Sequence, residues 1–243
     1  GEYTTTGEGT VAIGASAARQ QLRLMDGVVI GHGAMNTSTS DLVTGVVAIG
    51  AYALGSSQGN TDYSVAIGYK AAHGQITTEP HSVYIGGFAG YNATSSFQSV
   101  MIGHGAGYNT GRSNSTQGTT LVGYQSGYNA TGSENTFVGS LAGKGGTTSA
   151  PFSSGQKNTA VGYAAFDAFT TALQVTAIGH QAGSAITTGG YNTFVGADAG
   201  QNVTTTMYSV GIGAEAARSA GANSLIAIGY GALDATNSTD ALG

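Results

Sequence analysis

The chain has 243 residues, of which 42 are glycine and only 8 % are charged, with a net charge of −5 and no cysteine. The lack of cysteine excludes disulfides and thiolate metal sites, and only seven Lys and Arg residues argue against a nucleic-acid partner. With 40 % hydrophobic residues the chain is unlike a disordered protein, and with only two prolines it is unlike collagen. No apolar run approaches the roughly 18 residues that a membrane-spanning helix needs.

A short motif, Val/Thr/Ile-x-Ile/Val-Gly, recurs thirteen times at intervals of 16 to 23 residues. Its glycines are, in chain order, Gly14, Gly31, Gly50, Gly68, Gly86, Gly103, Gly123, Gly139, Gly162, Gly179, Gly196, Gly213 and Gly229. β-Branched residues at alternate positions predict a short strand before each glycine, as at Val65–Ile67. A period near 17 is too short for the usual helical repeats, so each copy is interpreted as one coil of a parallel β-solenoid.

Other positions of the repeat are also regular. Alanine lies three residues after the motif glycine in twelve of thirteen copies, with Ser126 as the exception, and this predicts a tightly packed site. A small polar residue often precedes the strand and is expected to hydrogen-bond along the stack of coils. These residues are Ser64, Ser82, Ser99, Asn135, Asn158, Asn192 and Ser209.

The motif covers nearly the whole chain and sets the expected domain limits. We expect a lead-in at residues 1–10, a solenoid of about thirteen coils at 11–235, and a tail at 236–243. Adjacent coils about 4.8 Å apart would give a rod roughly 60 Å long. In such a rod each coil contacts only its neighbours.

The middle residue of the motif strand suggests self-association. It is never charged, and five copies carry a large residue there: Tyr84, Met101, Leu121, Phe137 and Phe194. Because a narrow coil has one interior, we expect the flanking residues to fill it and these middle side chains to meet another copy. A continuous apolar stripe is an unusually large exposed patch for a monomer. Closed cyclic symmetry would cover it.

The motif resembles those of known fibre proteins. Ser64–Gly68, Ser82–Gly86 and Ser209–Gly213 resemble the head repeats of YadA-like trimeric autotransporter adhesins. Asn135–Gly139 and Asn192–Gly196 are similar to repeats of phage tail fibres and related bacterial fibre proteins. The resemblance implies a left-handed parallel β-roll, a homotrimer and a role in surface attachment. The coils here are longer than those of the adhesin heads, so no ligand of that family is carried over.

Candidate binding residues lie in the turns. Tyr91, Tyr108 and Tyr128 occur five residues after their glycines in consecutive coils, each followed by an asparagine: Asn92, Asn109 and Asn129. A ladder of rings beside amides would suit a neutral glycan, or it would stabilise the stack of coils. Two polar insertions, Gly111–Gly118 with Arg112 and Gly145–Gly155 with Phe152, predict protruding loops that bind a partner or vary neutrally.

Three further patterns favour structural explanations. Asp198 and Glu215 occupy the same repeat position in adjacent coils. Their carboxyl groups could lie near the ~5 Å separation of retaining glycosidases, but nothing in the sequence indicates a cleft. His32, His104 and His180 directly follow their glycines and are expected in polar turns rather than at a metal on a trimer axis. Threonine recurs eight or nine residues after the glycine, which predicts a turn ladder rather than an ice-binding face. These residues are Thr77, Thr94, Thr131, Thr147, Thr170, Thr187 and Thr204.

Together these patterns predict a non-enzymatic protein without cofactor or metal. We expect a homotrimeric extracellular fibre segment, an adhesin head or tail-fibre shaft, that presents loops to a cell surface, a glycan or a host receptor. A ligand-free spacer is the main alternative, and a glycan-cleaving spike is a remote one. Location on a cell surface or a virion fibre follows from the same resemblance.

Overall fold

The computed structural model describes residues 6–20, 23–37, 42–57, 61–74, 81–111, 116–146 and 152–234. Within these ranges the chain forms short strands and turns, without a helix, so no helix there could cross a membrane. The expected all-β parallel solenoid is confirmed, with about eleven turns. The chain divides into two compact units, Gly1–Val122 and Gly123–Gly243.

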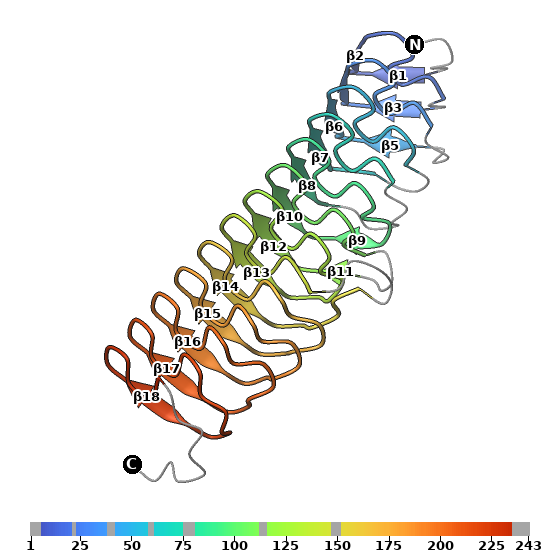
Figure 1. Ribbon diagram of the computed structural model, residues 1–243. Coiled ribbons are helices and arrows are strands. Elements are labelled where there is room, and N and C mark those ends of the chain that lie inside the picture. Colours follow the sequence, from blue (N-terminus) through green and yellow to red (C-terminus); the bar gives the residue numbers. More distant parts are fainter. Residues whose placement is uncertain are drawn as a thin grey trace. The chain divides into compact units, whose positions relative to one another are not determined.

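The first unit stacks seven motif strands in parallel, each paired with the next copy along the chain (Figure 1). They are β2 (Val11–Ile13), β4 (Val28–Ile30), β6 (Val47–Ile49), β7 (Val65–Ile67), β8 (Val83–Ile85), β10 (Val100–Ile102) and β12 (Thr120–Val122). Smaller parallel sheets form from β1 (Thr6–Glu8), β3 (Arg23–Met25) and β5 (Val43–Thr44), and from β9 (Ser96–Phe97) and β11 (Thr116–Gln117). The lead-in expected at residues 1–10 thus contains β1, while the expected tail lies outside the described residues.

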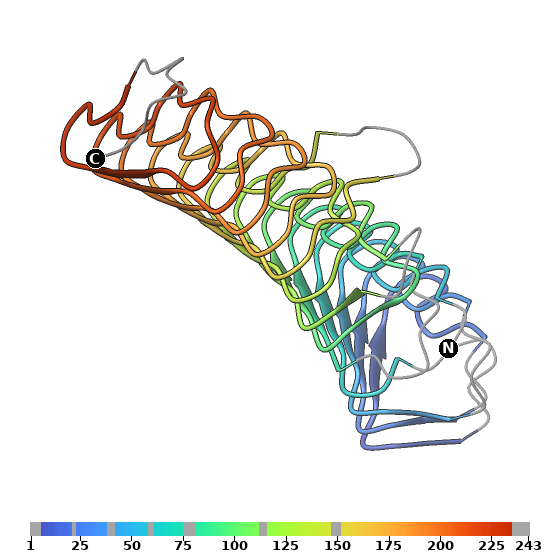
Figure 2. The same cartoon turned by 90° about the horizontal axis from the view of Figure 1, so that it is seen from below.

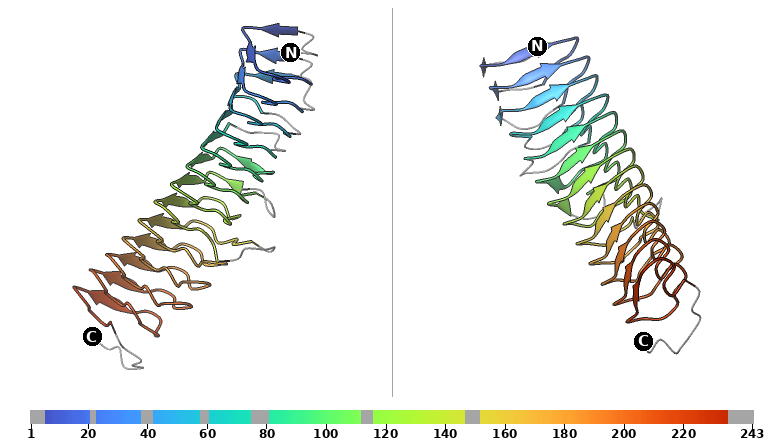
Figure 3. Two further views of the ribbon diagram at one scale, coloured as in Figure 1. Left: turned by 45° about the horizontal axis from the view of Figure 1, so that its top comes forward. Right: turned by 90° about the vertical axis from the view of Figure 1, so that its left-hand side faces the viewer.

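The second unit continues the same arrangement with six parallel motif strands (Figure 3, right). They are β13 (Thr136–Val138), β14 (Thr159–Val161), β15 (Thr176–Ile178), β16 (Thr193–Val195), β17 (Val210–Ile212) and β18 (Ile226–Ile228). Equivalent residues pair, as Thr159 does with Thr176 and Phe194 with Gly211. In each unit the strands line one side of the coils and turn-rich segments close the other (Figure 2).

The orientation of the motif strands reverses the expectation from the sequence. The five large middle residues, expected to be exposed in an isolated chain, are each 0 % exposed in a single chain: Tyr84, Met101, Leu121, Phe137 and Phe194. They point into the coil, where burial also raises the pKa of the Tyr84 hydroxyl. The flanking β-branched residues point outward instead, and Ile178, Ile212 and Ile228 are 38 %, 42 % and 68 % exposed. The prediction that middle residues face a second copy is therefore wrong.

In several coils the interior is filled by two positions, of which one is large and aromatic or aliphatic and the other is glycine or alanine. The middle strand residue faces the residue six positions later, and all five large middle residues face a glycine there. At Gly200 an added Cβ would lie 2.6 Å from the Phe194 ring. Where the middle residue is Ala160, the facing position holds Phe166, which is fully buried. Other coils carry small residues at both positions, as at Ala66 and Ala72 or Gly211 and Ala217, so the compensation is confined to the coils with one large residue.

The motif glycine is required by the contact between coils. Its φ lies between +120° and +141° in every copy, a region that L-residues rarely adopt. An added Cβ at Gly162 would lie 2.3 Å from the backbone oxygen of Gly179 in the next coil. The backbones therefore approach too closely for any side chain.

The alanine three residues after the glycine closes the turn. Its N–H donates to the carbonyl of its own motif glycine, as from Ala142 to Gly139 at 3.3 Å. Ala106, Ala142 and Ala182 are 0 % exposed, so the expected burial is confirmed. Ser126 fits the same site because its hydroxyl donates to the Phe137 carbonyl at 3.0 Å.

The small polar residue before the strand forms an internal ladder, as expected. Asn158 donates through Nδ2 to Asn135 Oδ1 at 3.1 Å and to the Ala172 carbonyl at 3.1 Å. Its own Oδ1 accepts the Val175 N–H at 3.0 Å. Ser82 and Asn192 accept backbone N–H groups of the following coil in the same way. The ladder satisfies polar groups that the coil would otherwise bury unpaired.

Replacing Asn158 with alanine should lower the free energy of unfolding by about 2–3 kcal/mol, because a buried N–H and a buried carbonyl lose their partner. The measurement is urea unfolding followed by circular dichroism. Asn202→Ala is the control, since this exposed amide bonds only the Ser219 hydroxyl among the contacts described, at 3.1 Å. Equal losses in both variants would contradict a stabilising role of the internal ladder.

A left-handed backbone corner precedes every motif strand. The residue five positions before the glycine has positive φ in all thirteen copies, although only three of these residues are glycine. Tyr63, Lys157 and Tyr208 adopt φ of 52°, 59° and 59°. The corner N–H donates to the previous coil, as from Lys157 to the Ser133 carbonyl. Hydrogen bonds between coils thus offset a conformation that costs about 1 kcal/mol or more per non-glycine residue.

Candidate functional site

The turn after each motif glycine presents a strip of side chains that we call the lateral belt. It comprises positions one, two, five and six after the glycine, and positions three and four point into the coil. In the coil of Gly68, Ala71 and Ala72 are buried, whereas Tyr69 is exposed and Lys70 is partly exposed. The residue at position two has a positive φ, which is 55° at Lys70. This turn of the backbone directs positions one and two outward and positions three and four into the coil. The belt carries most of the candidate residues.

In the first unit the lateral belt is rich in aromatic and imidazole rings. Neighbouring rings from successive coils contact one another at centroid distances of 5.0 to 6.5 Å. The rings belong to His32, Tyr52, Tyr69, His73, Phe88, Tyr91, His104 and Tyr108. We call this set the aromatic belt. These rings form one partly exposed group, and exposed apolar groups are candidates for interaction surfaces.

Tyr91 and Tyr108 lie together as the sequence predicts. Their rings stack at 5.0 Å with an interplanar angle of 24°, and His73 stacks on Tyr91 at 5.2 Å. Neighbouring rings thus cover both faces of Tyr91, which favours a stabilising stack there and leaves edges and hydroxyls for a ligand. Asn92 donates to Asn109 Oδ1 at 3.0 Å, so the amides form a parallel ladder.

The other predicted binding residues have different surroundings. Tyr128 and Asn129 belong to the second unit, where Tyr128 is partly exposed and Asn129 is 1 % exposed. Phe152 is 7 % exposed, so its ring packs into the protein rather than protruding. Arg112 lies outside the described residues, as do residues 113–115 and 147–151 of the two insertions. Of the predicted binding residues, Tyr91 contacts Tyr108 and Asn92 contacts Asn109.

Lys70 is the cation of the aromatic belt. Its ammonium nitrogen lies 5.4 Å from the Tyr69 ring centroid and 5.7 Å from that of Tyr91. Such cation–π contacts are weak at exposed sites, about 0.5–1 kcal/mol. Burial and, secondarily, the charge of Lys70 lower the pKa of His73, which favours the neutral imidazole. Lys70 thus supplies the fixed positive charge beside these rings.

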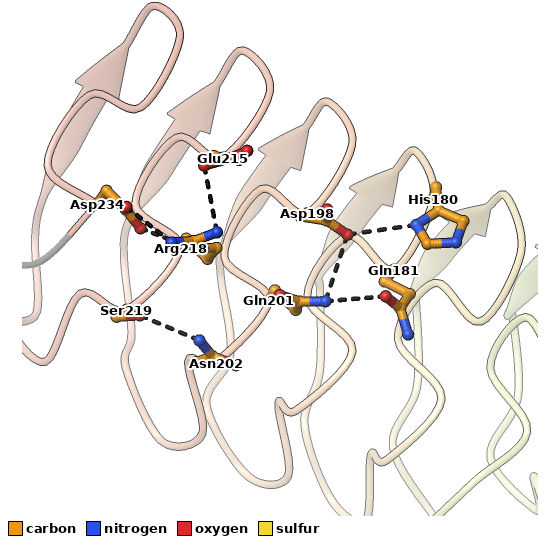
Figure 4. Close-up of polar contacts among 9 residues, drawn as sticks. All are labelled: His180, Gln181, Asp198, Gln201, Asn202, Glu215, Arg218, Ser219 and Asp234. Carbon is orange, nitrogen blue, oxygen red and sulfur yellow. Dashed lines mark hydrogen bonds and ion pairs between the residues drawn. The ribbon is translucent and has the colours of Figure 1, made fainter.

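In the second unit the same belt positions are polar and charged (Figure 4). Asp198 lies 3.3 Å from His180 Nδ1 and 3.3 Å from Gln201 Nε2. Arg218 contacts Glu215 at 3.2 Å, and its Nε and Nη2 donate to the two carboxylate oxygens of Asp234 at 2.8 and 2.9 Å. Asp234 raises the pKa of the Arg218 guanidinium. This part of the belt is a ladder of mutual contacts between coils.

The glycosidase alternative gains no support from this geometry. The Asp198 and Glu215 side chains are each 31 % exposed and lie beside His180 and Arg218, respectively. A general acid of the glycosidase type needs a carboxyl group in an apolar environment that raises its pKa. Neither carboxylate has such surroundings here.

The histidine and threonine patterns have local explanations. His180 stacks on Tyr163 at 5.5 Å, while His32 and His104 contact rings of the aromatic belt. Within the described ranges, no three His, Cys, Asp or Glu side chains form a group that could hold a metal ion. Thr170 and Thr187 donate to carbonyls of the next coil at 3.0 and 3.2 Å, the contacts of the predicted turn ladder. Thr77 and Thr147 lie outside the described residues.

A recess of about 320 Å³ adjoins the described part of the second insertion. Polar groups and one apolar side chain line it: Ser154, Gly155, Gln156, Lys157, Thr171, Leu173 and Gln174. Its volume is at the lower end of that for small-molecule sites. It lacks an aromatic wall, so it offers hydrogen bonds and one cation but no ring face.

The sequence analysis missed Tyr69, Lys70, His73 and Phe88 as members of one site. A signal was present, because these residues occupy belt positions one, two and five of consecutive copies. The tyrosines at position five share one offset from the glycine, whereas Tyr69, Lys70 and Phe88 lie at other offsets, and only the turn geometry brings the offsets together. No protein-family model, no curated protein and no solved structure matches this chain.

Proposed function

We propose that the chain is a self-associating β-solenoid, a homotrimeric segment of an extracellular fibre that carries lateral surfaces for attachment. The observation that supports this is the outward face of the motif strands. All 26 flanking positions are β-branched, so no charged residue interrupts the face in either unit. Leaving such a face in water is costly, and in soluble proteins large apolar patches are usually interfaces.

The repeat itself favours a second copy of this chain as the partner. A surface that matches many layers must have the same rise per layer, about 4.8 Å. Another copy in parallel orientation has this rise by construction and places β-branched residues opposite β-branched residues. Two exposed tyrosines, Tyr191 and Tyr208, border the face at the corner before the strand. Aromatic residues are enriched in protein interfaces.

Three copies and a left-handed coil are what the resemblance to adhesin heads and tail fibres implies. Closed cyclic symmetry would cover the outward face of every copy. The lateral belt lies on the turns rather than on this face and would stay accessible. Three parallel belts would raise the avidity of weak contacts with a surface. The alternative is a ligand-free spacer, which would associate through the same outward face but bind no ligand at the lateral belt. Binding measurements distinguish the attachment segment from the spacer.

Charged substitutions on the outward face test this proposal. The wild-type protein should have three times the chain mass of 24.0 kDa in solution. The double variant Ile178→Glu, Ile212→Glu should run at a lower mass, because it would bury unpaired carboxylates between copies. Leu173→Glu is the matched control, since Leu173 is 39 % exposed and Ile178 is 38 % exposed, but only Ile178 lies on a motif strand.

Sedimentation equilibrium measures the mass, and circular dichroism checks that each variant keeps its β-structure. A wild-type protein that stays monomeric at tens of micromolar would contradict the proposal. So would a double variant with unchanged mass, because the interface would then lie elsewhere.

A further inference from the structure

Among the described residues, Lys70 has no carboxylate within ion-pair distance, whereas Arg218 contacts two. The acidic residues described in the first unit are Glu8, Asp26 and Asp62, and Asp62 accepts the Thr44 N–H. Lys70 is instead held between two tyrosine rings. A partly exposed ammonium group with no described carboxylate beside it can pair with a negatively charged ligand.

The rings around Lys70 offer a complementary apolar surface. Tyr69 is 47 % exposed, and its ring meets Phe88 edge-to-face at 5.2 Å with an interplanar angle of 85°. Phe88 also contacts Tyr91 at 5.5 Å and Tyr108 at 6.2 Å, so several rings fix its position. Unlike Tyr91, Tyr69 contacts a single ring among those described, and part of its surface faces solvent. Such a ring can pack against the C–H face of a sugar.

We propose that Tyr69, Lys70 and Phe88 form a subsite for a carboxylate-bearing sugar, such as a hexuronic acid residue of a surface polysaccharide. The proposal rests on the attachment role proposed above and names its ligand class. The sugar ring packs on Tyr69, and its carboxylate pairs with the Lys70 ammonium. The partly exposed Asn92 amide, which donates to the buried Asn109, adds a polar group to the same belt.

The shape of the surface agrees with a polysaccharide rather than a free small molecule. The subsite is an open part of the belt, so it contacts one side of a sugar and leaves the chain free to continue. A single ion pair on a partly exposed surface is weak, and it changes affinity by no more than about fivefold. Repetition along a polymer, and in the copies of an assembly, supplies the remaining affinity. The recess at Lys157 lacks an aromatic ring and is the weaker candidate.

The test compares two hexasaccharides on the assembled protein. One alternates glucuronic acid and N-acetylglucosamine, and the other is the same oligosaccharide with its carboxyl groups reduced to alcohols. Titrations followed by NMR should show roughly three- to fivefold tighter binding of the acidic form. Lys70→Gln should remove that difference, and Tyr69→Ala should weaken binding of both forms.

The repeat supplies backbone-compatible replacements and a control. Gln125 and Gln181 occupy the position of Lys70 in other coils with φ of 52° and 51°, so glutamine fits this backbone. Lys157→Gln removes a lysine outside the aromatic belt and should leave the preference for the acidic form unchanged. The mass and melting temperature of each variant are measured first, so a loss of assembly is distinguished from a loss of binding.

Equal binding of the two hexasaccharides by an intact assembly would overturn the role of the carboxylate. Absence of binding to either would overturn the subsite. A preference for the acidic form that survives Lys70→Gln would show that another group recognises the carboxylate.

Discussion

Replacing Gly162 with alanine is expected to lower the free energy of unfolding by more than about 3 kcal/mol, because strain and overlap add. The backbone at Gly162 has φ of +134°, a conformation that is essentially restricted to glycine. The new Cβ would also lie 2.3 Å from the Gly179 oxygen, and a backbone atom in a stacked coil cannot rotate away. Urea unfolding with circular dichroism provides the measurement.

A substitution at Gly229 separates the cost of backbone strain from the cost of overlap with the next coil. Gly229 has the same kind of backbone, with φ of +120°, but an added Cβ would meet no atom within 4 Å. Gly229→Ala should therefore show only the conformational cost, about 1–3 kcal/mol. The difference between the variants measures the approach of one coil to the next. Equal losses would contradict that contact as the reason for the motif glycine.

The sequence allowed the strands to be predicted because the motif glycine marks each one with a fixed offset. Every expected strand, from Val11–Ile13 to Ile226–Ile228, is present in parallel register. The burial of Ala142 and the ladder through Asn158 were also correct, since small and amide side chains at one repeat position have few alternatives. These features depend on the spacing between nearby residues, and the same spacing recurs in every copy of the repeat.

The orientation of the strands could not be fixed by alternation alone. In a strand, side chains alternate between the two faces, so the middle residue and its neighbours must face opposite sides. The alternation does not indicate which of the two sides is the interior. The informative signal lies six residues further on, where a large residue such as Tyr84 or Phe194 is matched by a glycine. That relation crosses a turn, and the corners of this turn have positive φ at residues such as Phe88 and Asp198. Non-glycine residues rarely adopt this conformation, so the path of the turn was not predictable from composition.

The same limit applies to the candidate site. Tyr91 and Tyr108 share one offset, so their contact was predictable. Lys70 and Phe88 reach the same surface from another offset in neighbouring coils, which requires the geometry of the turn. The buried position of Phe152 was not foreseen either, because an aromatic residue in a polar insertion was interpreted as an exposed contact.

Moving the phenyl group of Phe194 to position 200 should restore stability that each single substitution removes. Phe194→Ala leaves a cavity in the coil and should cost about 3–5 kcal/mol. Gly200→Phe alone should also destabilise, by about 1–3 kcal/mol or more, because its Cβ would lie 2.6 Å from the Phe194 ring. The double variant recreates the natural pair of Ala160 and Phe166 found two coils earlier.

The backbone supports this exchange, since Gly200 and Phe166 have φ of +61° and +54°. The double variant should therefore unfold with a smaller loss than Phe194→Ala alone, which gives a favourable coupling energy of more than about 1 kcal/mol. Combining Phe194→Ala with Gly221→Ala is the control, because an added Cβ at Gly221 meets nothing within 4 Å, and these two effects should add. Additive losses in the exchanged pair would show that the two positions do not share one interior volume. A favourable coupling would mean that positions 194 and 200 share one interior volume, which a phenyl group can fill from either side of the turn.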